Sequence, residues 1–332
     1  MNKSHICAII VVAVIVIAAA AFALTRDDSQ PTDDGEHEYT YQTYKMGGEL
    51  ITQTIDGIPE RVIVGNVAAL EMMLEFDLGD RIVALMYYDL FYDTNCVTPH
   101  LQERLDEVKN RIGEENIFYN DGMSMAYATT LEPDLIFGYV SAFGDDPDAT
   151  LGSVEYWNNL GCACLSMRTQ ATSDECNIEG FTTDYNILGD IFGVRDQTDA
   201  FVEEYKATLD SIADADFQAT CIELNDDTSF YSYGSESFPG FMITESGGTY
   251  LFDRGNHDKS ELVNATDLDL IILVVFSSSD YESLRGELMD DPTLAYVPAV
   301  QEGNIILKGL SGIYGGPGSL ETLRDIAEIV SG

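Results

Sequence analysis

The stretch that decides the fold runs from Pro59 to Leu85 and reads PERVIVGNVAALEMMLEFDLGDRIVAL. Its first part, 61–65, is a short β-branched run that is typical of a buried strand. Residues 68–76 then repeat apolar side chains at helical spacing, Gly79 ends that helix, and 81–88 (RIVALMYY) return to a strand. Short apolar strands alternating with helices predict parallel pairing in a sheet that helices cover on both faces.

The same rhythm extends to both sides of a long helical interval. Residues 59–178 form the first predicted α/β lobe, and residues 216–332 form the second. Between them, 179–215 contains no proline and keeps helical spacing with a break near Gly193, so we expect a connecting helix there. The predicted fold class is therefore α/β, with two Rossmann-like lobes that have parallel-type sheets and are joined by a long connecting α-helix.

The residues before the first lobe divide into two parts. Residues 25–58 begin with a charged linker and continue into two alternating runs that meet at Gly47-Gly48, which predicts a short hairpin. We expect its tyrosines to form one face of the hairpin. Residues 1–24 contain an uncharged run from Ile6 to Leu24, which fits either a retained membrane anchor or a cleaved signal. Acids follow this run, and either outcome predicts an extracytoplasmic location, at the cell surface or in the periplasm.

The composition excludes several classes of partner. The chain has 332 residues, enough for two lobes, and its 45% apolar content indicates a folded protein. Asp and Glu number 58 against 16 Lys and Arg, so the net charge is -42 at pH 7. Such a field repels phosphate backbones and anionic lipid, so we expect no nucleic-acid partner.

The cysteine pattern favours a role in apolar packing over metal binding. Cys162 and Cys164 lie two residues apart in a predicted strand, so they share a face and do not easily bond each other. No pair of C-x₂-C clusters that would suit zinc is present. We expect buried small apolar side chains, with room for one disulfide that involves Cys176.

Four stretches, in order, resemble the solute-binding proteins of ABC importers for iron–siderophore complexes, haem and cobalamin. They are 59–85, LEPDLIFGY at 131–139, GGTYLF with DLDLIILVV at 247–275, and LAYVPAVQEGNIILKG running into YGGPGSLETLRDIAEIV at 294–330. The resemblance implies a ligand between two lobes, at loops that follow the carboxyl ends of strands. It also implies an ABC permease and its ATPase as partners, a metal chelate as ligand, no intrinsic cofactor, and no enzyme activity.

Carried over by position, the loops give candidate ligand-binding residues in both lobes. These are Asn66, Tyr87, Tyr88, Asp89, Tyr139 and Arg168 in the first lobe, and Tyr231, Tyr233, Arg254, Phe276 and Tyr314 in the second. Rigid aromatic rings with a polar tip suit a large flat metal complex, and an arginine fork suits an anionic group. The alternative is that the aromatic residues close the lobe cores and the arginines pair with local acids.

The sequence departs from this family at its permease-docking positions. The family has an exposed glutamate in each lobe, and the matching positions here are Ala126 and Phe241. Nearby acids such as Glu245 could substitute.

Other functions fit the sequence less well. No Ser, His and Asp set stands out, and YGGPGS at 314–319 fits either an anion site at a helix start or simply the beginning of the last helix. A receptor for free metal ions would need more histidines than His100 and His257 in the folded lobes. A non-transport surface protein would need no tyrosine-lined strand ends. We expect a monomer, and the sequence does not distinguish the chelates.

Overall fold

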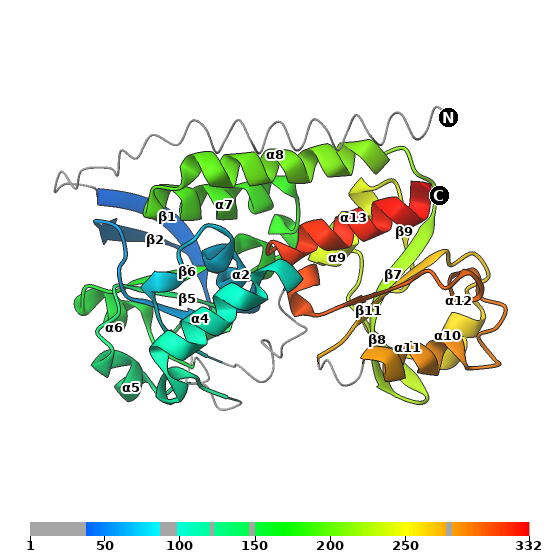
Figure 1. Cartoon of the computed structure of the whole chain (residues 1–332), viewed down its shortest axis with the longest axis horizontal. Helices are drawn as coiled ribbons and strands as arrows, with labels where there is room; N and C mark the ends of the chain where they lie inside the picture. Colours follow the sequence, from blue (N-terminus) through cyan, green and yellow to red (C-terminus); the bar gives the residue numbers. More distant parts are fainter. Residues whose placement is uncertain (1–37, 87–97, 120–122, 146–149, 277–280, 332) are drawn as a thin grey trace. The chain divides into compact units, whose positions relative to one another are not determined.

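The computed structural model describes residues 38–86, 98–119, 123–145, 150–276 and 281–331 (Figure 1). The predicted anchor and linker therefore lie outside the described residues. Within the described ranges, no helix is both long enough and apolar enough to cross a bilayer. All of these residues belong to one unit, Glu38–Gly332.

The first lobe is built on a four-stranded sheet in the order β4-β3-β5-β6, and every pair in it is parallel. This confirms the predicted parallel pairing. Three of the four strands are buried along their whole length, as expected when helices cover both faces. The strands are β3 (Val62–Gly65), β4 (Ile82–Leu85), β5 (Leu135–Gly138) and β6 (Ala163–Ser166), and the helices are α2 (Val67–Glu75), α4 (Gln102–Ile112), α5 (Met125–Thr130) and α6 (Val154–Asn159).

The predicted hairpin forms and lies along the edge strand β6. Strands β1 (Glu38–Lys45) and β2 (Glu49–Asp56) pair antiparallel, and Gly47 and Gly48 supply the positive φ angles of the turn. Side chains of the hairpin replace a missing neighbour strand. Tyr41 Oη donates to the carbonyl of Cys164 at 3.0 Å, and Thr43 Oγ1 accepts from the N–H of Ser166 at 2.8 Å. The hairpin thus protects an edge that would otherwise expose unpaired backbone groups.

The interval between the lobes contains two helices rather than one. Helix α7 (Ile178–Phe192) ends at Gly193, whose φ of 69° is the left-handed conformation that commonly terminates helices. Helix α8 (Arg195–Ile212) follows, and it packs against both α7 and the last helix, α13 (Gly318–Ser331) (Figure 1). Gly193 therefore breaks the predicted connecting helix where the sequence places the break, and α8 makes the contact with the second lobe.

The second lobe has a mixed sheet in the order β10-β8-β7-β11-β12, with β9 also paired to β7. Strands β7, β11 and β12 are parallel as predicted, whereas β8 is antiparallel to both β7 and β10. The strands are β7 (Gln218–Asp226), β8 (Ser229–Ser232), β9 (Thr249–Tyr250), β10 (Gly255–Asp258), β11 (Leu270–Val274) and β12 (Ile305–Lys308), and the remaining helices are α9 (Phe238–Glu245), α10 (Lys259–Val263), α11 (Tyr281–Met289) and α12 (Pro298–Glu302).

A tight turn causes this difference from the predicted parallel-type sheet. Only Asp227 and Thr228 separate β7 from β8, and the Asp226 carboxylate accepts from the N–H of Thr228 at 2.8 Å. So short a link can join only antiparallel strands, because a parallel pair needs a crossover of a dozen residues or more.

The largest apolar cluster continues from one lobe into the other. It includes Leu70 of the first lobe, Tyr185 of α7, and Phe238 and Ile313 of the second lobe, all buried. Continuous apolar packing of this kind predicts a stiff connection between the lobes.

Three of the described cysteines, Cys162, Cys164 and Cys221, are buried free thiols, as the packing interpretation predicts. Cys176 is half-buried, and its thiol donates to the carbonyl of Thr169. It is not bonded to another described cysteine; Cys96 lies outside the described residues.

Candidate functional site

Five of the predicted residues come together from the two lobes, and we call them the Tyr–Arg cluster: Tyr139, Tyr231, Tyr233, Tyr314 and Arg254. Tyr139 directly follows β5 of the first lobe, and Tyr314 follows the 3-10 helix η8 (Leu310–Ile313) of the second. Their rings meet edge to face, with centroids 6.3 Å apart. Both residues are half-buried, so each lobe contributes one tyrosine to the same place.

The second lobe supplies the other three members. The rings of Tyr231 and Tyr233 are 5.6 Å apart at nearly a right angle. Arg254, just before β10, donates from Nε to Tyr231 Oη at 3.1 Å, and Tyr233 Oη donates to Glu223 Oε2 at 3.4 Å. Hydrogen bonds therefore fix the polar tips of Tyr231 and Tyr233.

Burial keeps the buried phenols of the cluster in their neutral form. It raises the pKa of Tyr314 to about 12, and it raises the pKa of Tyr233 well above its ordinary value. The hydrogen bond to Tyr231 raises the pKa of Arg254 further, so its guanidinium stays charged. Neutral hydroxyls and rings suit stacking and hydrogen bonding to a bulky ligand better than they suit direct ligation of a metal by a phenolate.

Gln170 is a residue of this region that the sequence analysis missed. Its Nε2 donates to the carbonyl of Tyr314 at 2.8 Å, and its Oε1 accepts from Asn66 Nδ2. A single amide therefore links the first lobe to the loop that carries Tyr314. No apolar period or known turn pattern marks Gln170 in the sequence.

Asn66, a predicted ligand contact, is fully buried at the start of α2. Its Oδ1 accepts from the N–H of Ala68 at 2.9 Å and caps the helix. With its amide directed to Gln170, Asn66 holds the loop geometry and presents no exposed surface.

Arg168 lies beside the hairpin and pairs with an acid. Its Nη1 is 2.9 Å from Glu175 Oε1, its guanidinium lies over the ring of Tyr44 at 5.8 Å, and its side chain is only 13% exposed. The buried Asp184 accepts from the backbone N–H of Arg168 at 2.7 Å and holds this turn in place. Arg168 thus matches the alternative in which an arginine pairs with a local acid, although its Nε has no hydrogen-bond partner among the described residues.

The remaining predicted residues add little to the geometry. Tyr87, Tyr88 and Asp89 lie outside the described residues. Phe276 is half-buried and packs against the apolar cluster that the lobes share.

A second place where the lobes meet is the polar junction, which we define as Glu71, Thr98 and Gly318. Glu71, fully buried on α2, accepts from the N–H and hydroxyl of Thr98 at 2.6 and 2.8 Å, and from the N–H of Gly318 at 2.8 Å. Burial raises the pKa of Glu71 to about 7. Within YGGPGS, the N–H of Gly318 at the start of α13 thus already has a partner, the chain's own Glu71 carboxyl group.

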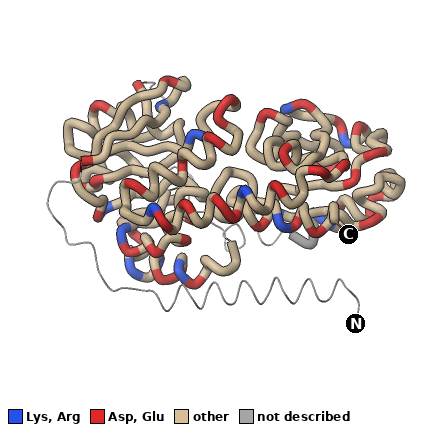
Figure 2. The backbone as a smooth tube through the Cα atoms, turned by 90° about the horizontal axis from the view of Figure 1, so that it is seen from above, with Lys and Arg blue, Asp and Glu red and all other residues tan. Residues whose placement is uncertain are grey.

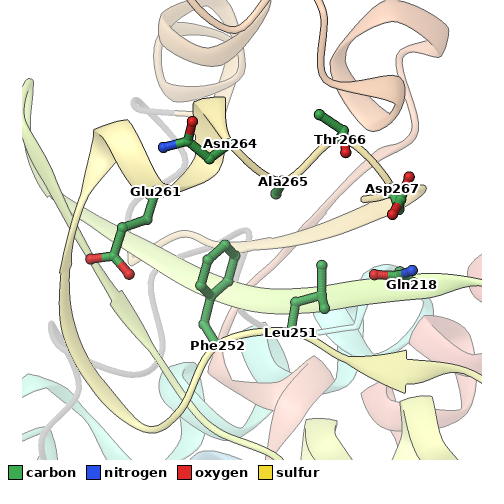
Figure 3. A pocket seen from close by; sticks show the side chains of 8 residues that line it. All are labelled: Gln218, Leu251, Phe252, Glu261, Asn264, Ala265, Thr266 and Asp267. Carbon is green, nitrogen blue, oxygen red and sulfur yellow. The ribbon is translucent and has the colours of Figure 1, made fainter.

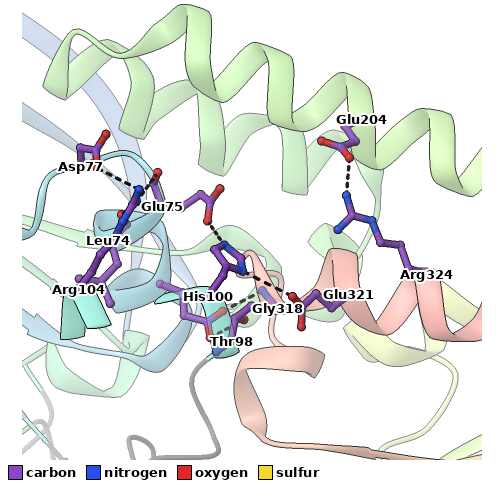
Figure 4. Close-up of polar contacts among 11 residues, drawn as sticks. Leu74, Glu75, Asp77, Thr98, His100, Arg104, Glu204, Gly318, Glu321 and Arg324 are labelled. Carbon is purple, nitrogen blue, oxygen red and sulfur yellow. Dashed lines mark hydrogen bonds and ion pairs between the residues drawn. The ribbon is translucent and has the colours of Figure 1, made fainter. Parts of the chain in front are cut away.

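Glycine makes the close approach at the junction possible. A Cβ at Gly316 would lie 2.8 Å from Ala68 Cα, and a Cβ at Gly318 would lie 2.8 Å from Thr98 Oγ1. More exposed contacts surround this buried centre. His100 lies between two glutamates, with Nε2 2.7 Å from Glu75 Oε2 and Nδ1 3.5 Å from Glu321 Oε1 (Figure 4). The junction therefore has a buried, hydrogen-bonded centre and an exposed rim.

A pocket of about 450 Å³ opens in the second lobe alone (Figure 3). Leu251 and Phe252 face Asn264, Ala265 and Thr266 across it, and Glu261 and Asp267 contribute carboxylates. It includes no residue of the Tyr–Arg cluster. Within the described ranges, no three His, Cys, Asp or Glu side chains are arranged to hold a metal ion.

Comparison with known proteins identifies similar folds among solved structures. No protein-family model and no curated protein sequence matches the chain. Among solved structures, a periplasmic binding protein from Veillonella parvula has a TM-score of 0.72 at 19% identity, over 87% of this chain and 89% of that one.

Two further structures carry more specific names. An ABC-type Fe3+-hydroxamate transport system protein from Saccharomonospora viridis has a TM-score of 0.64 at 16% identity, over 88% of this chain and 99% of that one. The periplasmic haem-binding protein HutB of Vibrio cholerae has a TM-score of 0.60 at 16% identity, over 82% and 99%. At these identities the likeness establishes the fold, and it confirms the two-lobed α/β architecture of periplasmic binding proteins that the sequence predicts.

Proposed function

We propose that this protein is the extracytoplasmic solute-binding component of an ABC importer, which captures a metal chelate between its lobes and delivers it to a membrane permease. The observation that carries the proposal is the meeting of Tyr139 from the first lobe with Tyr314, Tyr231, Tyr233 and Arg254 from the second. A ligand bound there would contact both lobes, as a bilobed receptor requires. The ligand class is an iron–siderophore complex, haem or cobalamin.

The names of the similar structures support the transport role and the location. They are a periplasmic binding protein, an Fe3+-hydroxamate transport system protein and a haem-binding protein, so the same fold serves such cargo elsewhere. None of these names describes an enzyme, in keeping with a binding function. The apolar run from Ile6 to Leu24 is the sequence feature that supports export or tethering.

Docking to a permease would need acids other than those expected from the family. Ala126 is exposed on α5, but Phe241 is buried on α9 and faces the core. Glu245, one turn later on α9, is exposed and is our candidate for the second-lobe contact.

The ligand bound by protein from the native host tests the proposal. Metal analysis, visible absorbance and mass spectrometry of the purified full-length chain should reveal a chelate with its metal. Bare zinc or manganese without an organic ligand would favour the free-metal receptor instead. If the protein arrives empty, titration with cobinamide, cobalamin, haem and ferric siderophores takes over, and failure of every chelate to bind at high micromolar concentration would refute the proposal.

A further inference from the structure

The charges around the Tyr–Arg cluster are the observation from which a narrower ligand class follows. Arg254 is the only arginine or lysine in the cluster, and two carboxylates lie next to members of the cluster. Glu223 accepts from Tyr233 Oη. Glu236 and Arg254 both lie next to Gly234, where an added Cβ would come within 3 Å of both side chains. The cluster and its neighbouring acids therefore carry no net positive charge.

Arg168, the second predicted anion contact, is already neutralised. It forms an ion pair with Glu175, and that same carboxylate accepts from Tyr44 Oη at 2.8 Å. Freeing the guanidinium for a ligand would leave a partly buried Glu175 without its cation, which is costly.

The stretches outside the described residues do not add a cation either. Residues 87–97 and 277–280 follow strands of the two sheets, and their sequences, YYDLFYDTNCV and SSSD, contain aspartates but no lysine or arginine. The other internal stretches, 120–122 and 146–149, read NDG and DPDA. By sequence, each of these segments therefore carries negative charge.

The whole molecule adds a field of the same sign. Acidic residues are spread along both lobes, and basic residues are few and scattered (Figure 2). With a net charge of -42, the protein repels an approaching polyanion and attracts a cation.

We propose that the Tyr–Arg cluster selects metal chelates whose net charge is zero or positive, and that it discriminates against polyanionic chelates. This inference rests on the proposed binding function. Ferric trihydroxamates and cobinamide-type corrinoids belong to the favoured class. Tris-catecholate complexes, which are trianionic, and haem, with its two carboxylates, belong to the disfavoured class.

A matched pair of ligands isolates charge from shape. One is a linear ferric trihydroxamate that ends in an ammonium group, and the other is the same chelate with its amine succinylated, which replaces the cation by a carboxylate. We expect the full-length chain to bind the ammonium form at least about tenfold more tightly at low salt. The ratio should shrink severalfold at 1 M salt, where the Debye length falls to about 3 Å.

Variants locate the effect in the cluster. Glu223→Gln and Glu236→Gln should each strengthen binding of the carboxylate form about threefold or more. Glu287→Gln makes the same change in net charge on α11, which carries no cluster residue, and it should leave the ratio unchanged. If all three variants act alike, the selection does not arise at the cluster.

The outcomes separate this inference from the function on which it rests. The charge selection is wrong if the carboxylate form binds as tightly as the ammonium form or more tightly. It is also wrong if a tris-catecholate complex binds more tightly than both hydroxamates. Either result would leave chelate binding itself intact. Failure of hydroxamate, catecholate, haem and corrinoid alike would overturn the proposed function itself.

Discussion

The polar junction and the Tyr–Arg cluster both join the two lobes, but they use opposite chemistry. At the junction, Glu71 is fully buried and three donors from Thr98 and Gly318 meet its two oxygens. At the cluster, Tyr139 and Tyr314 meet through ring edges and remain partly exposed. Displacing any of these hydrogen-bonding groups would destabilise the folded state, whereas the cluster can exchange one aromatic contact for another.

This difference assigns different tasks to the two regions. A buried carboxyl group with every partner in place fixes one geometry, because each unpaired group would carry its full desolvation cost. Aromatic surface with neutral hydroxyls can bind a bulky ligand without rebuilding the core. We therefore expect changes at the junction to alter stability and changes at the cluster to alter affinity.

The largest expected effect is at the junction. Glu71→Ala leaves two buried N–H groups and a hydroxyl without an acceptor, and it also creates a cavity. We expect the free energy of unfolding to fall by about 3–4 kcal/mol. Urea unfolding of the full-length chain at pH 7 measures it.

Glu75→Ala is the matched control, because Glu75 is on the same helix but partly exposed beside His100. It should cost less than about 1 kcal/mol. Equal losses for the two variants would contradict the contrast between a buried centre and an exposed rim.

The pH dependence of stability sharpens the same comparison. Burial raises the pKa of Glu71 and of Asp184 to about 7 from ordinary values of 4.5 and 3.8. Between these values the native state holds protons that the unfolded state has released, so stability rises as pH falls from 7 towards 4.5 and is lost above 7. For Glu71 the gain is at most about 3 kcal/mol.

Glu71→Gln should flatten this slope, and unfolding measured from pH 4.5 to 8 will show it. The parent and variant share the general loss of acidic repulsion, so their difference isolates the one carboxyl group. Tyr314, with a pKa of about 12, contributes no slope in this range. Parallel pH curves for parent and Glu71→Gln would show that Glu71 titrates normally in the folded protein.

Substitutions in the Tyr–Arg cluster should change the affinity for the chelate. Tyr314→Ala removes one ring from the proposed binding face and should weaken chelate binding about fivefold to tenfold. Tyr314→Phe keeps the ring and should cost less than about threefold. Tyr296→Ala, at a tyrosine that is 84% exposed and outside the cluster, serves as the control and should bind as the parent does. Titrations of the parent and all three variants would contradict the assignment if Tyr314→Ala and Tyr296→Ala behaved alike.

The smallest effect belongs to an exposed contact between α8 and α13. Arg324 and Glu204 form an ion pair there, and more than half of each side chain is exposed (Figure 4). Glu204→Gln should change the free energy of unfolding by less than about 0.5 kcal/mol, and less still in high salt. Thermal unfolding at two salt concentrations checks this, and a loss above about 1 kcal/mol would show that the connection at α8 depends on charge rather than on packing.

Much of the fold could be predicted because short-range signals specify it. The buried runs at 62–65 and 135–138 and the paired glycines 47–48 each have one local interpretation. The antiparallel β8 was missed because the strand pattern alone does not give direction; the short acidic turn before it does.

The candidate site was only partly predictable for the same reason. Tyr139 stands at a strand end, so general α/β geometry finds it. Gln170 and the acids Glu223 and Glu236 matter through contacts that are remote in sequence, and no local pattern marks them. Glu71 carried a weak signal, as an acid within a helix that is otherwise apolar at 67–74.

Hydrogen–deuterium exchange of the full-length chain with and without a neutral ferric trihydroxamate tests most directly where the ligand binds. We expect the chelate to slow exchange in peptides that contain Tyr139, Tyr231 to Tyr233 and Tyr314, which come from both lobes. Peptides covering 261–267, which line the second-lobe pocket, should exchange as before. Protection confined to 261–267, with the peptides of the Tyr–Arg cluster unchanged, would contradict the account.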